Sequence, residues 1–246
     1  MARTREGAGH RPVRTLTRRP PGPGPAIRKD GTVFATTVLL DLDGTLVDSA
    51  AGILGSLREA FDEVGLPWTE AELGTQLLGP PMYTSLPPII GTEATREVVP
   101  VYRRIYAERG LLNSTPYPGV DELLQTLSDG NRRLALATSK VEYSARRILD
   151  NRGWTPLFTA IVGDTDNAGR PTKSDVIAEA LRQLDATPGD TVMVGDRSHD
   201  VVGALHNGLP CIGAGWGYGQ PGELTGAGAT SVCDTVADLG EALGTP

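Results

Sequence analysis

The sequence predicts an α/β fold, a doubly wound parallel sheet with a Rossmann-like core into which a helical segment is inserted. After residue 115, short apolar segments rich in β-formers alternate with amphipathic helical segments, a pattern typical of a parallel sheet covered on both faces. Another such strand is predicted at residues 36–41. The roughly sixty residues that separate it from the later alternation are predicted to contain helices and no convincing strand. We therefore expect a disordered basic tail over 1–34, a core formed by 35–50 and 115–246, and a helical domain over 51–114.

The individual elements follow from apolar spacing and turn residues. Residues 36–41 are an apolar run that ends in a carboxylate, as expected for a buried parallel strand. Apolar residues from Ile53 to Val64 recur at three- and four-residue spacing, and Gly65 ends that helix. In chain order the expected elements are strand 36–41, helix 49–64, a short helix near 73–78, the break Gly79-Pro80-Pro81, helix 92–109, helix 120–127, strand 134–137, helix 141–151, strand 160–162, helix 174–184, strand 191–194, helix 199–206 and strand 210–213.

Charge is distributed unevenly along the chain. The formal net charge is −7, and residues 1–34 carry +6, which leaves −13 on residues 35–246. A folded part this acidic argues against nucleic-acid binding, because neutralising phosphates needs a basic face. Divalent metals and small phosphorylated substrates remain compatible. For the Arg-, Pro- and Gly-rich tail, a solvated extension, a polyanion-binding segment and a transit peptide stay open.

Cysteine usage and hydropathy argue against disulfide-rich, zinc-binding, membrane-spanning and secreted proteins. Cys211 and Cys233 are the two cysteines and form no C-x-x-C pair, so reduced thiols are expected rather than a disulfide framework or a zinc site. No stretch approaches the roughly 18 apolar residues of a membrane span. Prolines and glycines follow Arg18-Arg19, where a signal peptide would need apolar residues. We expect a cytoplasmic protein without a membrane partner, as a monomer or homodimer.

Two carboxylates one residue apart follow the first core strand. At the carboxyl end of a parallel strand, Asp41 and Asp43 would form a compact oxygen site suited to Mg²⁺, where one carboxylate attacks phosphorus. An Asp-Gly turn without function is the plain alternative. An EF-hand loop counted from Asp41 fails, because Leu46 replaces the required Gly and Gly52 the required Glu. A dinucleotide site also fails, since no G-x-G-x-x-G follows the strand.

Polar residues also occur near strand ends or helix starts in three later segments of the chain. Thr138 and Ser139 follow a strand and are expected to open the next helix, either to bind an anion or only to cap it. Lys173 stands just before another helix. Asp196 and Asp200 follow the end of a later strand. The carboxyl ends of parallel strands meet at one sheet edge, so these residues are candidates for a common site.

Taken together, the motifs resemble the haloacid dehalogenase-like (HAD) hydrolase superfamily, whose pattern is D-x-D-G-T, then Thr or Ser, then Lys, then G-D-x-x-x-D. Within it, residues 40–49 (LDLDGTLVDS) and 137–140 (ATSK) look most similar to the phosphoglycolate phosphatase-like group. The resemblance covers about residues 36–240 and implies that the helical insertion is a mobile cap. One departure is Ser174 after Lys173, where many phosphoglycolate phosphatases carry Pro, which leaves room for nucleotidase-like relatives.

The resemblance implies catalytic roles at the strand ends. Asp41 would be the nucleophile that forms an aspartyl-phosphate, and Asp43 the general acid and base. Thr138 or Ser139, together with Lys173, would hold the phosphoryl oxygens. Dehalogenases of this superfamily lack a carboxylate at the position of Asp43, so its presence favours phosphoryl transfer over carbon–halogen cleavage.

The resemblance also implies a magnesium site. Mg²⁺ would be held by Asp41, the main-chain carbonyl of Asp43 and Asp196, while Asp200 supports the metal and its waters. These are the hard oxygen ligands that Mg²⁺ prefers.

Substrate discrimination and water exclusion are expected from the cap, where Pro80, Pro81 and Tyr83 are the candidates to face the substrate. The expected function is a Mg²⁺-dependent phosphatase that hydrolyses a small phosphorylated metabolite. A 5′-nucleotidase or a pyrophosphatase of the same fold stays open. A non-catalytic phosphate-binding module is a further alternative, against which the presence of both Asp41 and Asp43 argues.

Overall fold

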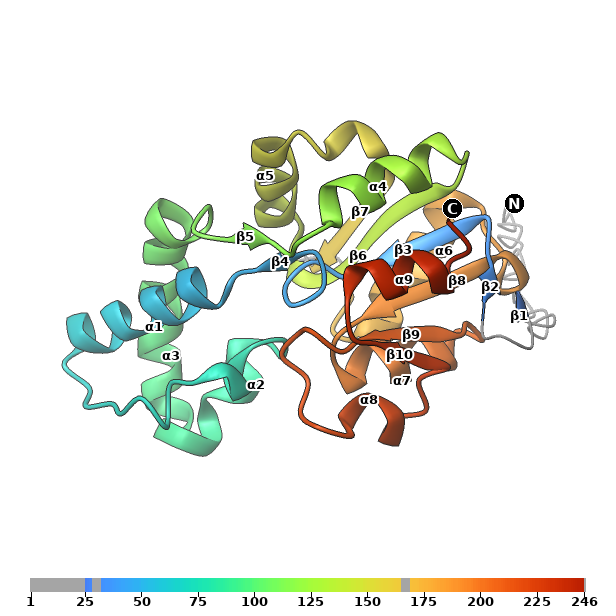
Figure 1. Cartoon of the computed structure of the whole chain (residues 1–246). Helices are drawn as coiled ribbons and strands as arrows, with labels where there is room; N and C mark the ends of the chain where they lie inside the picture. Colours follow the sequence, from blue (N-terminus) through green and yellow to red (C-terminus); the bar gives the residue numbers. More distant parts are fainter. Residues whose placement is uncertain (1–24, 28–31, 165–168, 246) are drawn as a thin grey trace, which may run out of the picture.

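The structure is a computed structural model that describes residues 25–27, 32–164 and 169–245. Its centre is a six-stranded sheet in which all neighbouring strands run parallel. The strands are β3 (Thr37–Leu40), β6 (Arg133–Val141), β7 (Phe158–Asp164), β8 (Thr191–Gly195), β9 (Cys211–Ala214) and β10 (Ser231–Cys233). Their spatial order is β10-β9-β8-β3-β6-β7 (Figure 1), which confirms the predicted α/β class.

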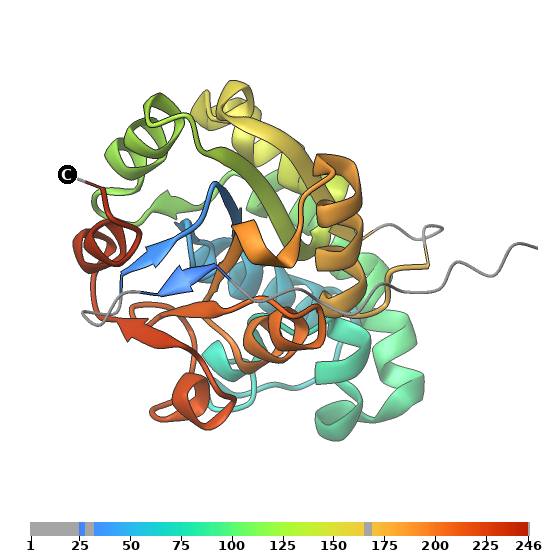
Figure 2. The same cartoon turned by 90° about the vertical axis from the view of Figure 1, so that its right-hand side faces the viewer.

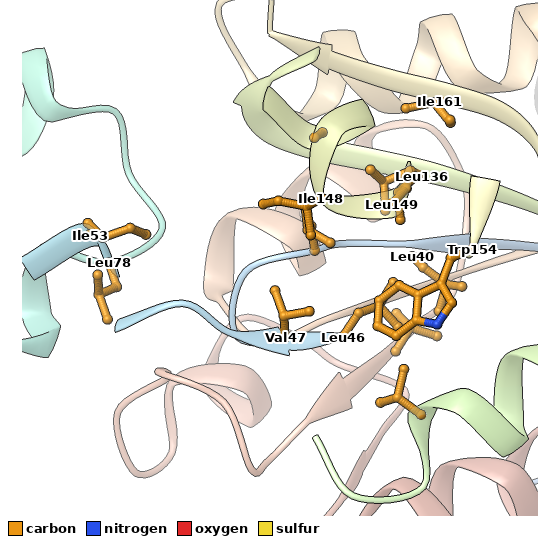
Figure 3. Packing of buried hydrophobic residues seen from close by; sticks show 14 of the residues in the cluster. Leu40, Leu46, Val47, Ile53, Leu78, Leu136, Ile148, Leu149, Trp154 and Ile161 are labelled. Carbon is orange, nitrogen blue, oxygen red and sulfur yellow. The ribbon is translucent and has the colours of Figure 1, made fainter. Parts of the chain in front are cut away.

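Helices cover both faces of this sheet (Figure 2). They are α4 (Val120–Asp129), α5 (Glu142–Arg152), α6 (Lys173–Leu184), α7 (Ser198–His206), α8 (Glu223–Gly226) and α9 (Val236–Ala242). Successive strand residues point to opposite faces, so Leu39 belongs to a cluster with α6 and α7, whereas Leu40 belongs to the cluster that contains α4 and α5 residues. Figure 3 shows Leu40, Leu136 and Trp154 in this larger cluster.

Register places the end of β3 at the middle of the sheet. Leu40 pairs with Leu136 of β6 on one side and with Val194 of β8 on the other. Residues that follow these three positions therefore emerge together at the carboxyl edge of the sheet, where sites form in parallel α/β folds.

The insertion between β3 and β6 is helical, as predicted, and lies at the left of Figure 1. It contains α1 (Ala50–Val64), the 3₁₀ turn η1 (Thr75–Leu77), α2 (Met82–Ser85), α3 (Pro87–Ile105) and the π-helical turn η2 (Tyr106–Gly110). Two short strands that the sequence did not indicate, β4 (Val47–Asp48) and β5 (Thr115–Pro116), pair antiparallel where the chain enters and leaves it. Ile53 and Leu78 share the larger hydrophobic cluster with the sheet (Figure 3), so the insertion packs on the core.

The chain ends differ from expectation. β1 (Ala26–Ile27) and β2 (Val33–Phe34) pair antiparallel, so the expected disordered tail is wrong for these residues. The remainder of that expectation, residues 1–24 and 28–31, lies outside the described residues. At the other end, β10, α8 and α9 were not expected, because they are short. Among the helices of the described ranges, none has the length and apolar character needed to cross a membrane.

Candidate active site

The first part of the site is the tight turn after β3. Asp41 directly follows the strand and is 5% exposed. Gly44 has φ of 84°, in the left-handed region, and a Cβ added there would lie 2.2 Å from Oδ2 of Asp196. Only glycine fits such a position. Gly44 therefore allows the turn after β3 to lie against Asp196, which comes much later in the chain.

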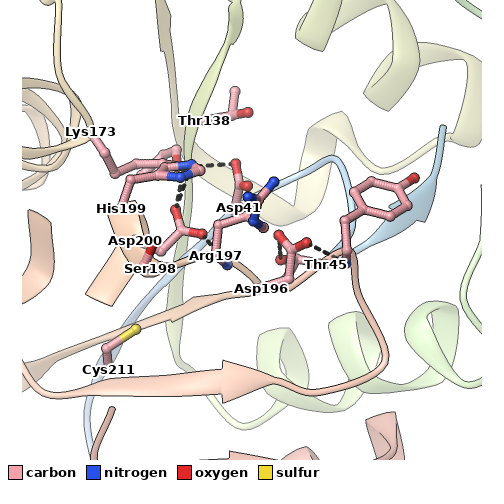
Figure 4. Close-up of polar contacts among 12 residues, drawn as sticks. Asp41, Thr45, Thr138, Lys173, Asp196, Arg197, Ser198, His199, Asp200 and Cys211 are labelled. Carbon is pink, nitrogen blue, oxygen red and sulfur yellow. Dashed lines mark hydrogen bonds and ion pairs between the residues drawn. The ribbon is translucent and has the colours of Figure 1, made fainter. Parts of the chain in front are cut away.

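The second part comes from β8 and the start of α7. Asp196 and Asp200 are both fully buried. Asp200 accepts a hydrogen bond of 3.0 Å from the backbone N–H of Arg197, which fixes it in the first turn of α7. Asp41, Asp196 and Asp200 each offer a carboxylate oxygen, and these oxygens lie within 4.8 Å of one another (Figure 4). The strand ends that were predicted to meet do meet.

The third part is Lys173, the first residue of α6. Thr172 caps that helix, accepting from the backbone N–H of Asp175, and so holds the lysine backbone in place. The Lys173 ammonium lies 2.9 Å from Oδ1 of Asp41 and 2.7 Å from Oδ1 of Asp200, and its side chain is 1% exposed. It also donates to the carbonyl of Ala137, at 2.9 Å. One buried cation thus bridges two of the three carboxylates.

Among the described residues, Lys173 is the ammonium that pairs with the carboxylates of this cluster. Burial raises the pKa of Asp41 and of Asp196, and the neighbouring Asp200 raises both further, although Lys173 acts against this at Asp41. Burial would also raise the pKa of Asp200, but Lys173 holds it below its usual range. When all three carboxylates are ionised, the single ammonium leaves two negative charges in this buried site. The oxygen donors and this excess charge fit a divalent cation such as Mg²⁺.

Asp43 has a different partner. Its carboxylate lies 2.8 Å from the Lys140 ammonium and is not part of the oxygen cluster found among the described residues. Burial alone would lower the pKa of Lys140, but Asp43 raises it above the usual value, so the lysine is charged. The ammonium also lies 4.9 Å from the ring centroid of Tyr106 in η2. The sequence contained Lys140 beside Ser139 but gave no sign of this pairing.

Thr138 and Ser139 are not at a helix start, which corrects the prediction. β6 continues to Val141, which is the N-cap residue of α5. The pairing of β6 with β7 shifts register between Ala137 and Val141, and this irregularity carries the chain past the sheet edge before the helix begins. The Thr138 hydroxyl accepts from the backbone N–H of Lys140, at 3.2 Å. Any anion binding by these hydroxyls would therefore not use the dipole of α5.

A cavity of about 280 Å³ joins the core residues to the insertion. The predicted site residues that line it are Asp41, Asp43, Thr138, Ser139, Pro80, Pro81 and Tyr83. All three cap candidates therefore share a cavity with the strand-end carboxylates. Lys173 lines an adjacent cavity of about 310 Å³, which also contains Pro80, Pro81 and Ser139.

The loop after β9 encloses Asp196 and was missed from the sequence. The backbone N–H of Tyr218 donates to Oδ2 of Asp196 at 2.8 Å, and its hydroxyl donates to Asp48 at 2.8 Å. Trp216 donates from Nε1 to the carbonyl of Thr45, at 3.1 Å. The glycines around Tyr218 were the available signal, since a Cβ at Gly217 would lie 2.3 Å from Asp196. This loop positions the Asp196 carboxylate and the turn that carries Asp43.

Comparison with known proteins agrees with this geometry. The family model described as haloacid dehalogenase-like hydrolase matches residues 38–214. The chain is 43% identical over 209 residues to the tyrosine-protein kinase PtkA of Mycobacterium tuberculosis. The matched region covers 84% of this chain and 72% of PtkA. It is 32% identical to the 5′-nucleotidase of Pseudomonas aeruginosa, over 87% of this chain and 98% of the nucleotidase.

Further similarity confirms the predicted resemblance. The chain is 31% identical to the phosphoglycolate phosphatase of Aquifex aeolicus, over 74% of this chain and 85% of that enzyme. The crystal structure of a predicted phosphatase from Clostridium acetobutylicum superposes with a TM-score of 0.79 at 34% identity, over 85% of this chain and 97% of the other. The motifs, the sheet with its helical insertion and these similarities lead to one conclusion: the chain belongs to the haloacid dehalogenase-like hydrolase family.

Proposed function

We propose that this HAD-family hydrolase is a Mg²⁺-dependent phosphatase that hydrolyses a small phosphorylated metabolite in the cytoplasm through an aspartyl-phosphate on Asp41. The observation that carries the proposal is the convergence of Asp41, Asp196 and Asp200 on one buried point, with Lys173 between two of them. Asp43 lines the same cavity as Asp41, where a leaving group would lie.

The proposed reaction uses these side chains in two steps. A carboxylate oxygen of Asp41 bonds to phosphorus while the bond from phosphorus to the leaving oxygen breaks, and Asp43, in its protonated form for this step, donates its proton to that oxygen. Asp43 then removes a proton from water, which attacks phosphorus and releases phosphate from Asp41. Lys173, with Thr138 or Ser139, would hold the non-bridging oxygens. Bound Mg²⁺, held by Asp41, Asp196 and the Asp43 carbonyl with support from Asp200, would supply neutralisation of the phosphoryl charge.

The test is a phosphate-release screen with Mg²⁺ over phosphoglycolate, sugar phosphates, nucleoside monophosphates and pyrophosphate. We expect turnover of at least one phosphomonoester, and a loss of at least about a thousandfold in Asp41→Asn, because nucleophile removal abolishes the covalent route. Asp234→Asn, at an exposed position, is the matched control and should retain activity. Turnover of none of the compounds would favour the non-catalytic phosphate-binding alternative, and turnover of nucleotides or pyrophosphate alone would favour the other hydrolase alternatives.

A second candidate is phosphoryl transfer to tyrosine, which the 43% identity to PtkA favours. In that reaction the γ-phosphoryl group of a nucleoside triphosphate would pass to a phenol oxygen rather than to water. Incubation with γ-labelled ATP and a tyrosine-containing peptide distinguishes the two. Label in the peptide supports the kinase, whereas label released only as inorganic phosphate supports the hydrolase.

A further inference from the structure

The cavity at the site has two chemically different sides. Its core side includes Asp41, Asp43 and the hydroxyl residues Thr138 and Ser139 of β6, where the phosphoryl group would react. Its cap side is formed mainly by apolar and aromatic side chains of α1, α2, α3 and η2. Among the described cap residues that line the cavity, Arg103 is the charged one, and its guanidinium carbon lies 5.5 Å from the ring centroid of Tyr83. The cap side therefore suits an apolar leaving group more than a highly charged one.

Three tyrosine rings line this cap side. Tyr102 and Tyr106 are stacked, with ring centroids 5.6 Å apart and planes at 22°. Tyr83, in α2, also lines the cavity and is 47% exposed. Three aromatic side chains in the lining of one cavity favour a ligand that is itself aromatic, because ring pairs gain more than their buried area alone provides.

One buried polar group on this side is the hydroxyl of Tyr106. Tyr106 is 7% exposed, and its hydroxyl makes no hydrogen bond of good geometry among the described residues. Burial raises the pKa of this phenol, although the Lys140 ammonium, which lies near the ring, acts to lower it. A buried hydroxyl left unpaired costs free energy, so a ligand that hydrogen-bonds to it would recover that cost. The cavity volume of about 280 Å³ lies just below the roughly 300–1,000 Å³ typical of ligand pockets, which suits a small leaving group such as one with a single ring.

We propose that the substrates are phosphate monoesters whose leaving group carries a single aromatic ring, with the ring held among Tyr83, Tyr102 and Tyr106. The inference rests on the proposed phosphatase reaction, because it places the phosphoryl group at Asp41. It goes beyond that function in naming the class of the leaving group.

The experiment compares benzyl phosphate with cyclohexylmethyl phosphate, in the full-length protein with Mg²⁺. Both esters release a primary alcohol and carry a six-membered ring, so the comparison isolates aromaticity from leaving-group reactivity. We expect kcat/KM to be about fivefold higher for benzyl phosphate, the factor that corresponds to about 1 kcal/mol of ring-pair interaction. Tyr83→Leu retains apolar bulk at a half-exposed position and should bring this ratio close to one.

Binding of the non-hydrolysable benzylphosphonate and cyclohexylmethylphosphonate, measured by calorimetry, separates this inference from the phosphatase proposal. Preferential binding of benzylphosphonate without turnover of either ester would support the aromatic site and overturn the phosphatase. Turnover of both esters at equal kcat/KM, with equal phosphonate affinities, would leave the phosphatase standing and overturn the aromatic site. Failure of both phosphonates to bind would also overturn it.

Discussion

The ammonium of Lys140 lies 2.8 Å from the carboxylate of Asp43, and the two side chains are 8% and 14% exposed. The pair joins the turn after β3 to the irregular end of β6, 97 residues apart in the chain. Asp43 is not part of the carboxylate cluster found among the described residues, and it lines the cavity between the core and the insertion. Asp41 and Asp43 therefore have different partners, Lys173 for the first and Lys140 for the second.

We predict that Lys140→Met lowers the free energy of unfolding by about 1–3 kcal/mol, because it leaves the largely buried Asp43 carboxylate without its cation. Phosphate release should fall as well, since the Asp43 side chain loses its anchor. A double-mutant cycle with Asp43→Asn in urea unfolding measures the coupling. A coupling below about 0.5 kcal/mol would show that the pair contributes little to the fold.

Asp196→Asn should remove the stabilisation of the protein by Mg²⁺. At a Mg²⁺ concentration 100 times its Kd, the parent should gain about 2.7 kcal/mol, whereas the variant should gain much less. Without metal, the variant should be at least as stable at pH 7, because burial raises the pKa of Asp196 and its ionised form opposes folding there. The asparagine oxygen can still accept from Tyr218. Thermal unfolding with Mg²⁺ and with EDTA checks this, and an unchanged Mg²⁺ shift in the variant would remove Asp196 from the metal site.

The sheet and its carboxylates could be predicted because the signal is local. An apolar strand followed at once by Asp41, or by Gly195 and Asp196, is visible within a few residues, and parallel pairing then brings the strand ends together. The register shift after Ala137 depends instead on how β6 meets β7, which no local pattern encodes. For that reason Thr138 was expected at a helix start.

The supporting contacts could not be predicted for a related reason. The Tyr218 hydroxyl meets Asp48 across 170 residues, and the Lys140 ammonium meets Asp43 across 97. Such pairs form only after the sheet and the insertion have packed. Their residue types, a surface-like lysine and a tyrosine in a glycine-rich loop, are common in positions without function.

Gly44→Ala should destabilise the protein more than a matched glycine substitution. Gly44 and Gly65 have similar left-handed backbones, with φ of 84° and 78°, but a Cβ at Gly65 would meet nothing within 4 Å. Gly65→Ala therefore measures the backbone strain alone, about 1–2 kcal/mol. Gly44→Ala adds the close contact with Asp196 and should cost at least about 1 kcal/mol more. Equal losses in urea unfolding would show that the turn moves freely away from Asp196.

Glu223 gives a pH-dependent contribution to stability. Its carboxylate accepts from the backbone N–H groups of Ser198 (2.8 Å) and Gln220 (2.9 Å) and pairs with Arg197 (3.0 Å). Burial alone would raise the pKa of Glu223, but these donors lower it to about 2. A depressed carboxyl pKa stabilises the fold above the usual value near 4.5, and this stabilisation is lost as the pH falls toward 2. Arg197 in turn contacts the carbonyl of Leu78, so the same ion pair supports the insertion.

Glu223→Gln should therefore lower the free energy of unfolding by about 1–3 kcal/mol at pH 7, because the amide cannot replace an ionised acceptor of three donors. The difference from the parent should shrink below pH 4.5, where the unfolded parent binds a proton that the folded parent does not. Urea unfolding at pH 7, 5 and 3.5 measures this trend. Glu241→Gln, at an exposed position in α9, is the control and should change stability by less than about 0.5 kcal/mol at each pH. A loss in Glu223→Gln that is constant with pH would mean that packing, and not the carboxylate charge, stabilises this loop.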